Sequence, residues 1–291
     1  MAKTEIGVMA HNEAGNLQRL LERLLAEPGD HRVCVVSSGS TDETNEIART
    51  IEKTSTRVRL IVEPARRGKA RAINRFLDDI NPETERVVLV SGDVLPDPGA
   101  LAHLLAPLDD PSIHMTGVRP CPMNPRKGWV NRVVHFQWNL LDQIARRNPK
   151  LGEMVAFRPP IEPLDPDTVV DEAALEAQLT HGAAGQLAYV HKARVANLGP
   201  QNLTDLISQR ERIWMGHLRL QQRTGYRVST FRLHDLFIPT TVFLVKHPSQ
   251  APVAIVAATI EGFARLRGSY KLRVHGELPT VWPRLLSAKI L

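Results

Sequence analysis

The first 120 residues alternate between short apolar segments and amphipathic segments, and this alternation restricts the possible folds strongly. The apolar segments have the character of buried strands, whereas the segments between them follow the period of a helix. Strands that alternate with helices form parallel sheets through right-handed crossovers. The sequence therefore predicts an α/β fold with a mostly parallel, twisted sheet flanked by helices. The predicted strands are Ile6–Ala10, Val33–Val36, Val58–Val62, Val87–Val90 and His114–Val118, and the predicted helices are Asn16–Ala26, Thr41–Lys53, Lys69–Ile80 and Gly99–Leu105.

Four of the predicted strands are followed by loops that carry polar side chains. Ligands of open parallel sheets bind at the carboxyl ends of the strands, so we expect these loops to form the site. Asp93 directly follows an apolar strand, where its carboxylate is placed to handle a metal or a phosphate. An ordinary surface turn before Pro96 is the alternative interpretation. The four loops are His11–Glu13, Ser37–Asp42, Glu63–Lys69 and Ser91–Pro96.

Charge and the missing motifs limit the partners and the class of enzyme. The chain has 37 Lys and Arg against 31 Asp and Glu, a net charge of +6, which favours an anionic partner. A nucleotide, a nucleic acid and an acidic membrane surface all fit that charge. The sequence contains neither G-x-x-x-x-G-K-[ST] nor a G-x-G-x-x-G after the first strand. Their absence disfavours a P-loop nucleoside triphosphatase and a Rossmann dehydrogenase.

The ends of the chain bear on its location. The N-terminus leads directly into a strand pattern, and there are only two cysteines, so we expect no signal peptide and a cytoplasmic location. No segment is long and apolar enough to span a bilayer. The segments Leu236–Val245 and Ala251–Leu266 allow two interpretations, helices buried on the catalytic domain or an interfacial hairpin at the inner face of the membrane.

Six short motifs occur in an order that resembles glycosyltransferase family 2, over about residues 4 to 230. This resemblance implies a GT-A fold and the transfer of sugar from a nucleotide-activated donor. The motifs are Ala10–Glu13 for A-x-N-E, Ser37–Asp42 for D-D-G-S-T-D, Arg67–Asn74 for G-K-x-x-A-x-N, Ser91–Asp93 for D-x-D, Asp171–Glu172 for the acidic acceptor motif, and Gln209–Trp214 for Q-x-x-R-W.

The resemblance also implies a domain organisation. Residues 1–230 would form the catalytic domain, with a donor half of about 1–120 and an acceptor half of about 121–230. Residues 231–291 would form a C-terminal helical extension. The proline-rich segment from Cys121 to Pro166 lies where the acceptor should bind, and we expect an ordered, irregular lid there.

The matching positions imply specific roles in binding and catalysis. Asp93 would bind a divalent metal, Mn²⁺ or Mg²⁺, that bridges the donor phosphates, with His217 as a further candidate ligand. In the acidic motif, Leu175 lies three positions after Glu172, so Glu172 is the candidate base and Asp171 flanks the acceptor. A charged helix N-terminus is the alternative role for this pair. The remaining donor-binding candidates are Ala10, Asn12, Glu13, Ser38, Lys69, Arg71, Gly92, Gln209, Arg212 and Trp214.

Three departures from the family pattern change these expectations. Ser38 replaces an Asp that reads the nucleotide base, so uridine is only the default donor base. Ser91 replaces the first Asp of D-x-D, which leaves Asp93 as the one carboxylate of that motif. Ile213 occupies the Trp position of Q-x-x-R-W, with Trp214 behind it, and this favours transfer of one sugar over processive polymerisation.

The sequence therefore predicts an inverting, hexosyltransferase-type enzyme that moves one sugar from a nucleotide-diphosphate sugar, by default a UDP-sugar, to a hydroxyl acceptor. The acceptor is a carbohydrate, a lipid or a small molecule, and nucleic acid is not expected. The alternative is a basic module that binds nucleic acid or an anionic membrane without catalysis, using clusters such as Arg66–Arg71. The carboxylates Asp93, Asp171 and Glu172 would repel a phosphate backbone and argue against that alternative.

Overall fold

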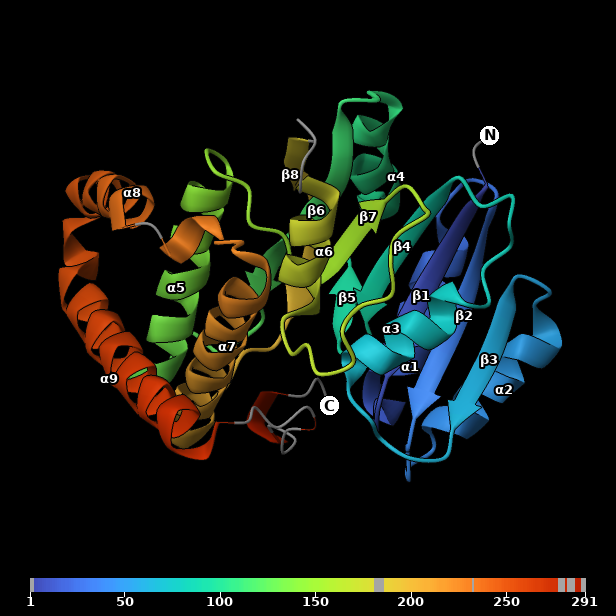
Figure 1. Cartoon of the computed structure of the whole chain (residues 1–291), viewed down its shortest axis with the longest axis horizontal. Coiled ribbons are helices and arrows are strands. Elements are labelled where there is room, and N and C mark those ends of the chain that lie inside the picture. The colour runs from blue at the N-terminus through green and yellow to red at the C-terminus, as the bar shows by residue number, and fades with distance from the viewer. Residues whose placement is uncertain (1–2, 181–185, 232, 277–280, 282–285, 289–291) are drawn as a thin grey trace. The chain divides into compact units, whose positions relative to one another are not determined.

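A computed structural model describes residues 3–180, 186–231, 233–276, 281 and 286–288, which form two compact units. The first unit contains the residues up to Pro120 together with Leu151–Asn197. The second contains Cys121–Lys150 together with residues from Leu198 onward. The ribbon in Figure 1 runs from the strands of the first unit to the C-terminal helices of the second.

The first unit is built on an eight-stranded mixed sheet in the order β3-β2-β1-β4-β7-β6-β8-β5. The four strands predicted first are mutually parallel, because β1 pairs with β2 and β4, and β2 pairs with β3. The pairs β4–β7, β6–β7 and β5–β8 are antiparallel. The strands are β1 (Thr4–Ala10), β2 (His31–Ser38), β3 (Val58–Glu63), β4 (Arg86–Ser91), β5 (Val94–Pro96), β6 (Ile113–Pro122), β7 (Met154–Phe157) and β8 (Gln186–Asn197).

Helices cover both faces of this sheet because successive strand residues point to opposite sides. Ile6 and Val8 of β1 belong to one hydrophobic core with the leucine stripe of α1, whereas Gly7 lies against the ring of Phe76 on α3. Leu17, Leu20, Leu21 and Leu24 of α1 are fully buried, and each contributes about 2 kcal/mol of hydrophobic stabilisation. The helices of the unit are α1 (Ala14–Ala26), α2 (Thr44–Thr54), α3 (Lys69–Leu77), α4 (Ala100–Leu105) and α6 (Asp171–Thr180), with a short 3-10 turn at Ala106–Asp109.

The second unit is helical. Helix α9 packs against α7 and α5, and the shared core contains Val134, Phe136, Leu206 and Ile260. The Asn202 side chain caps α7 by accepting a hydrogen bond from the Asp205 N–H at 2.9 Å. The helices are α5 (Trp129–Ala145), α7 (Leu203–Thr224), α8 (Leu233–Lys246) and α9 (Ala251–His275), with 3-10 turns at Ser229–Phe231, Pro248–Gln250 and Leu286–Ala288.

The predicted α/β fold with C-terminal helices is confirmed, and most element boundaries agree within a few residues. Helix α2 begins at Thr44 instead of Thr41, and Glu43 is its N-cap residue. The Asp42 carboxylate, which lies before the helix, accepts a hydrogen bond from the Thr44 N–H at 3.0 Å. Helix α3 ends at Leu77 instead of Ile80. The sequence analysis did not identify β5 or β8, which pair with each other.

The predicted irregular lid at Cys121–Pro166 is wrong. This segment contains the 17-residue helix α5 and the strand β7, which joins the sheet between β4 and β6. Helix α5 forms because Val133, Val134 and Phe136 supply a buried face. The prolines of the segment from Cys121 to Pro166 lie outside α5 and β7, so they do not interrupt either element. The division into a catalytic domain at 1–230 and an extension at 231–291 stays a prediction.

The two C-terminal apolar segments become α8 and α9. One face of α9 is buried through Val253, Ala257 and Ile260, and Phe263 and Leu266 are exposed. None of the helices in the described part of the chain combines the length and apolarity that crossing a bilayer requires.

Candidate active site

The loops after β1 and β2 are held together by Asn12. This residue has a φ of 55°, in the left-handed region, and its Oδ1 accepts hydrogen bonds from the N–H groups of Thr41 at 2.7 Å and Asp42 at 3.4 Å. Its own N–H donates to Ser40 Oγ at 3.1 Å, and the Glu13 N–H donates to Thr44 Oγ1 at 2.8 Å. Two of the six sequence motifs are therefore adjacent in space and fixed relative to each other.

Gly92 brings the Asp93 turn to the end of β1. The Gly92 N–H donates to the Met9 carbonyl at 2.9 Å, and a Cβ on Gly92 would lie 3.1 Å from that oxygen and 3.3 Å from Ala10 Cα. A side chain would therefore force the turn away from β1. Ala10 and Gly92 shape the site through this close backbone contact, and they place Asp93 beside the loop that contains Glu13.

Ser38 lies directly across from Glu63 in the pairing of β2 with β3. The Ser38 hydroxyl donates a hydrogen bond to Glu63 Oε2. Both residues lie at the carboxyl ends of their strands, where Ser38 is buried and Glu63 is half-buried. A carboxylate is therefore present beside position 38, although Ser38 itself has none.

Lys69 at the start of α3 forms ion pairs with both members of the acidic pair at the start of α6. Its Nζ lies 2.7 Å from Asp171 Oδ2 and 2.8 Å from Glu172 Oε1. Burial opposes the charge on Lys69, but the two carboxylates outweigh it and raise its pKa. Burial, followed by the charge of Glu172, raises the pKa of Asp171 despite Lys69. The Glu172 side chain is 21% exposed and that of Asp171 8%, so Glu172 is the more accessible carboxylate.

Glu153 joins this group of charges, and the sequence analysis missed it. Burial, followed by the negative charge of Asp93, raises the pKa of Glu153 to about 8. Glu172 and Asp171 raise it further, and Lys69 opposes them. Glu153 immediately precedes β7, whose four apolar residues were a strand signal inside the segment interpreted as a lid.

The carboxylates fit a hard divalent cation. In the described residues, no three His, Cys, Asp or Glu side chains are grouped so as to hold a metal by themselves. Asp93 and Glu153 supply oxygen donors, and the repulsion between them would be relieved by a cation. Mg²⁺ typically uses only one or two carboxylates where substrate phosphates and water complete its shell.

The candidates from the last motif lie on α7, in the second unit. Gln209, Arg212 and Trp214 are half-buried, and His217 is buried. Burial, followed by the charge of Lys150, lowers the pKa of His217 well below its ordinary value, so the imidazole is neutral at pH 7. Neutral imidazole is the form that binds metals.

Trp214 has several contacts within the second unit. Its Nε1–H donates to Ser269 Oγ at 2.9 Å, its ring stacks on Phe231 at 4.7 Å, and the Arg265 guanidinium lies 4.6 Å from its ring centroid. These contacts are those of a packed side chain. The roles of Gln209, Arg212, Trp214 and His217 in donor or metal binding stay predictions, as does that of Arg71, which is exposed on α3.

Two solved structures with a similar fold are sugar transferases by their names. A mannosyltransferase from Pyrobaculum calidifontis, in complex with GDP-Man and Mn²⁺, is 20% identical, with a TM-score of 0.67 over 94% of this chain and 88% of that chain. Glucosyl-3-phosphoglycerate synthase from Mycobacterium tuberculosis, in complex with Mn²⁺, UDP-glucose and phosphoglyceric acid, is 20% identical, with a TM-score of 0.54 over 78% of this chain and 81% of that chain.

The match to a family model identifies the family, whereas the solved structures above show only a similar fold. No curated protein matches the chain significantly. Residues 5–160 match the family model of glycosyl transferase family 2, which covers more than half of the chain and includes Asn12, Ser38, Lys69 and Asp93. The chain therefore belongs to glycosyltransferase family 2.

Proposed function

We propose that this protein is a metal-dependent, inverting glycosyltransferase that moves one sugar from a nucleoside-diphosphate sugar to a hydroxyl acceptor. The observation that carries the proposal is the group of interacting charges at Asp93, Glu153, Lys69, Asp171 and Glu172 within one compact unit. The group combines oxygen donors for a cation with an accessible carboxylate. Its acceptor is a carbohydrate, a lipid or a small molecule.

The transfer follows from the chemistry of Glu172. The acceptor oxygen attacks the anomeric carbon of the donor sugar, its proton passes to the Glu172 carboxylate, and the bond from that carbon to the phosphate oxygen breaks. The nucleoside diphosphate leaves with the bonding electron pair. Lys69 Nζ lies 2.8 Å from Glu172 Oε1, and this ion pair would hold the carboxylate in place for the proton transfer. A divalent cation held by Asp93 would stabilise the charge that develops on the leaving phosphate.

The nucleobase is proposed to be recognised at Ser38 and Glu63. A carboxylate accepts hydrogen bonds, so it suits the N3–H of uracil and the N1–H and exocyclic amine of guanine. Cytosine and adenine carry no ring N–H at the corresponding position. The chemistry therefore favours UDP and GDP over CDP and ADP, and we take a UDP-sugar as the default donor. The Ser38 hydroxyl would orient Glu63 through their hydrogen bond.

Thermal stabilisation by nucleotides tests the donor assignment. We expect UDP or GDP with Mn²⁺ to raise the melting temperature more than CDP, ADP or short DNA does, and slow hydrolysis of the matching nucleotide sugar to identify the sugar. Glu63→Gln should weaken UDP or GDP binding by about 10-fold, because one charge-assisted hydrogen bond is weakened. Stabilisation by DNA alone, lost at high salt, would instead identify the non-catalytic basic module.

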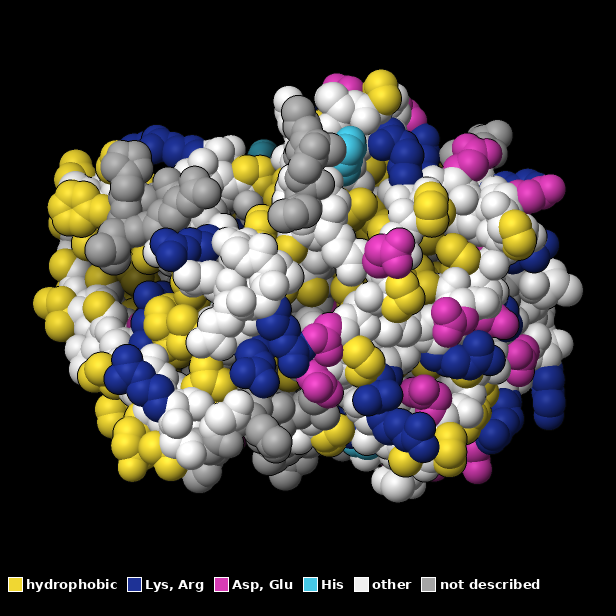
Figure 2. Space-filling view, viewed as in Figure 1, with side chains coloured by type: hydrophobic (Ala, Val, Ile, Leu, Met, Phe, Trp, Pro, Cys, Tyr) yellow, Lys and Arg dark blue, Asp and Glu magenta, His cyan; other side chains and the backbone are white. Residues whose placement is uncertain are grey.

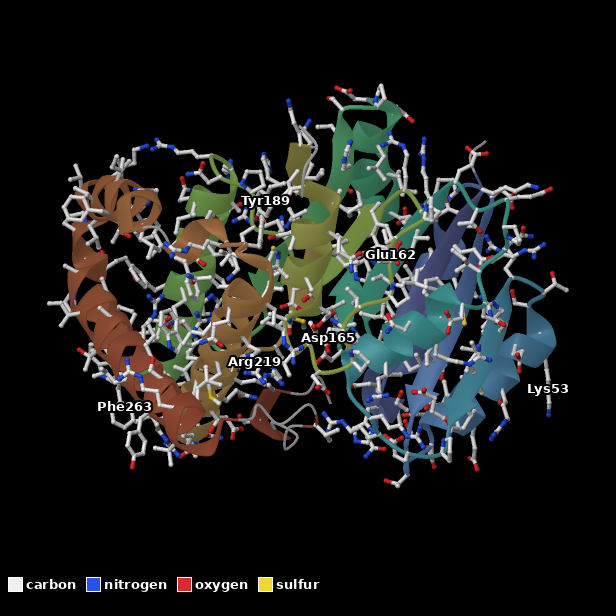
Figure 3. The ribbon with its side chains drawn as sticks, in the orientation of Figure 1. Lys53, Glu162, Asp165, Tyr189, Arg219 and Phe263 are labelled. Atoms are coloured by element: carbon white, nitrogen blue, oxygen red, sulfur yellow. The ribbon has the colours of Figure 1, made fainter. Side chains whose placement is uncertain are left out.

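We also propose that the C-terminal helices contact an anionic membrane surface at the cytoplasmic side. Phe237 and Val245 on α8, and Ile255, Phe263 and Leu266 on α9, are exposed by 53 to 76%. Hydrophobic side chains lie among other side chains along the left edge of the surface in Figure 2, and Phe263 is labelled on the outer side of α9 in Figure 3. Lys246, Arg267 and Arg273 are exposed on the same two helices and suit acidic lipid headgroups.

A further inference from the structure

We propose that Glu153 is a second carboxylate ligand of the divalent cation, and that from its position directly before β7 it supplies the negative charge that Ser91 does not supply from β4. This inference rests on the metal-dependent donor binding proposed above and names a residue outside the D-x-D-like motif. It concerns only side chains of the first unit.

The pairing of two strands places Glu153 beside the motif. Strand β4 is antiparallel to β7, and Val90 pairs with Met154. One step further along this ladder, the Ser91 N–H donates to the Glu153 carbonyl at 3.2 Å. Glu153 therefore lies across from Ser91, although 62 positions separate the two residues in the sequence. The backbones of residues 153 and 91 are therefore adjacent, so a carboxylate side chain at either position would start from nearly the same place in the sheet.

The conformation and surroundings of Glu153 point to a ligand. Its φ of 65° is in the left-handed region, which is costly for a residue with a side chain. Its side chain is half-buried, and its carboxylate makes no hydrogen bond or ion pair with any residue in the part of the chain that the structure describes. Among the neighbouring charges, the like charge of Asp93 acts most strongly on Glu153. A cation between Asp93 and Glu153 would convert this repulsion into attraction.

Coordination chemistry leaves room for a second carboxylate beside Asp93. A cation of the Mg²⁺ type needs six oxygen ligands, and proteins usually provide one or two carboxylates while phosphates and water provide the rest. Ser91 offers only a neutral hydroxyl beside Asp93. Adding Glu153 gives the site two negative charges, which strengthens its attraction for a divalent cation.

Direct metal binding tests this inference without measuring turnover. Mn²⁺ is titrated into the full-length protein with UDP or GDP at a saturating concentration, and unbound Mn²⁺ is followed by electron paramagnetic resonance. We expect Glu153→Gln to weaken Mn²⁺ binding by about 10-fold or more. The double variant Ser91→Asp with Glu153→Gln should regain most of the affinity, because the charge returns on the neighbouring strand. Glu162→Gln, at an exposed acid of the same unit that Figure 3 labels, should bind Mn²⁺ like the parent.

The outcomes separate this inference from the proposed function. Unchanged Mn²⁺ affinity in Glu153→Gln, with normal binding by the parent, would overturn the role of Glu153 alone. A loss in Glu153→Gln that the double variant does not repair would overturn the equivalence of positions 91 and 153. A parent protein that binds no Mn²⁺ would overturn the proposed function as well. Urea unfolding without metal checks folding, and Glu153→Gln should be at least as stable as the parent because a repulsion is removed.

Discussion

At the scale of single residues, two serines occupy positions at which the family motifs have an acid. Each of them lies opposite a glutamate on the neighbouring strand or at its end. Ser38 pairs with Glu63, and Ser91 lies opposite Glu153. Neighbouring strands are only about 5 Å apart, so a side chain on either strand can reach the same ligand. The charge that a site requires is therefore not tied to one sequence position. We therefore expect a motif without its acid to keep its chemistry when the adjacent strand supplies one.

The acidic pair gives the prediction at this scale. Glu172→Gln removes the proposed proton acceptor but keeps the size of the side chain, so acceptor glycosylation should fall by about 10²- to 10⁴-fold. Donor affinity should change little, because Glu172 is assigned to the acceptor. Transfer rates at saturating donor, measured across pH, check this.

Asp171→Asn is the matched control. It should retain more transfer activity than Glu172→Gln, because Asp171 is assigned to flank the acceptor and not to take its proton. A dead Asp171→Asn beside a nearly normal Glu172→Gln would move the base to Asp171. Full activity in both variants would mean that Asp171 and Glu172 only place negative charge at the N-terminus of α6.

At the scale of elements, charged side chains connect α7 to α9 in the second unit. Glu261 lies 2.7 Å from both Arg210 Nε on α7 and Arg265 Nε on its own helix. Burial acts to raise the pKa of Glu261, but the charges and hydrogen bonds of the two arginines outweigh it and lower the pKa to about 2. Buried Glu211 of α7 likewise pairs with Arg267 and Lys271 of α9. The C-terminal helix is therefore attached by ion pairs as well as by its apolar face.

This arrangement predicts a stability that depends on pH. A folded pKa below the unfolded value of about 4.5 means that ionised Glu261 stabilises the fold above pH 4.5 and that this contribution is lost as the pH falls toward 2. Glu261→Gln should lower the unfolding free energy by about 2 kcal/mol at pH 7. Urea unfolding at pH 7 and pH 3 measures it. An equal difference between variant and parent at both pH values would contradict the assignment.

At the scale of the whole molecule, the net charge of +6 and the exposed apolar side chains of α8 and α9 act together. Basic charge attracts an anionic surface over a Debye length, and apolar side chains add affinity only after contact. The proposed membrane contact therefore requires both features, and high salt should weaken it. It would bring the enzyme to lipid acceptors if its acceptor is a lipid.

Flotation with liposomes tests this contact. The parent should float with vesicles of phosphatidylserine and phosphatidylcholine at low salt, and Phe263→Ser with Leu266→Ser should reduce the bound fraction by at least about 10-fold, because two large apolar side chains are lost. Leu203→Ser, at an exposed apolar residue on α7, is the control and should float like the parent. A parent that stays entirely in the aqueous fraction would refute the membrane contact.

The sequence by itself determined the elements whose signal is local. The strands β1 to β4, the helices between them and the loops at their ends follow from apolar periodicity, and the family follows from short motifs with fixed spacing. Asp93, Lys69, Asp171 and Glu172 were identified in this way, and the ion pairs from Lys69 to the acidic pair bring three of them together.

Only the tertiary structure decided which distant residues share a strand pair or a helix contact. Glu153 gave no motif signal, because its importance comes from the pairing of β7 with β4 and from the charge of Asp93. Helix α5 was not predicted from the sequence. Its apolar face is buried by packing against α9, which is distant in the sequence. Local periodicity records which face of an element is buried, but it does not record what covers that face. Strand pairing and helix packing are non-local, so a side chain supplied by a neighbouring element becomes visible only after the chain has folded.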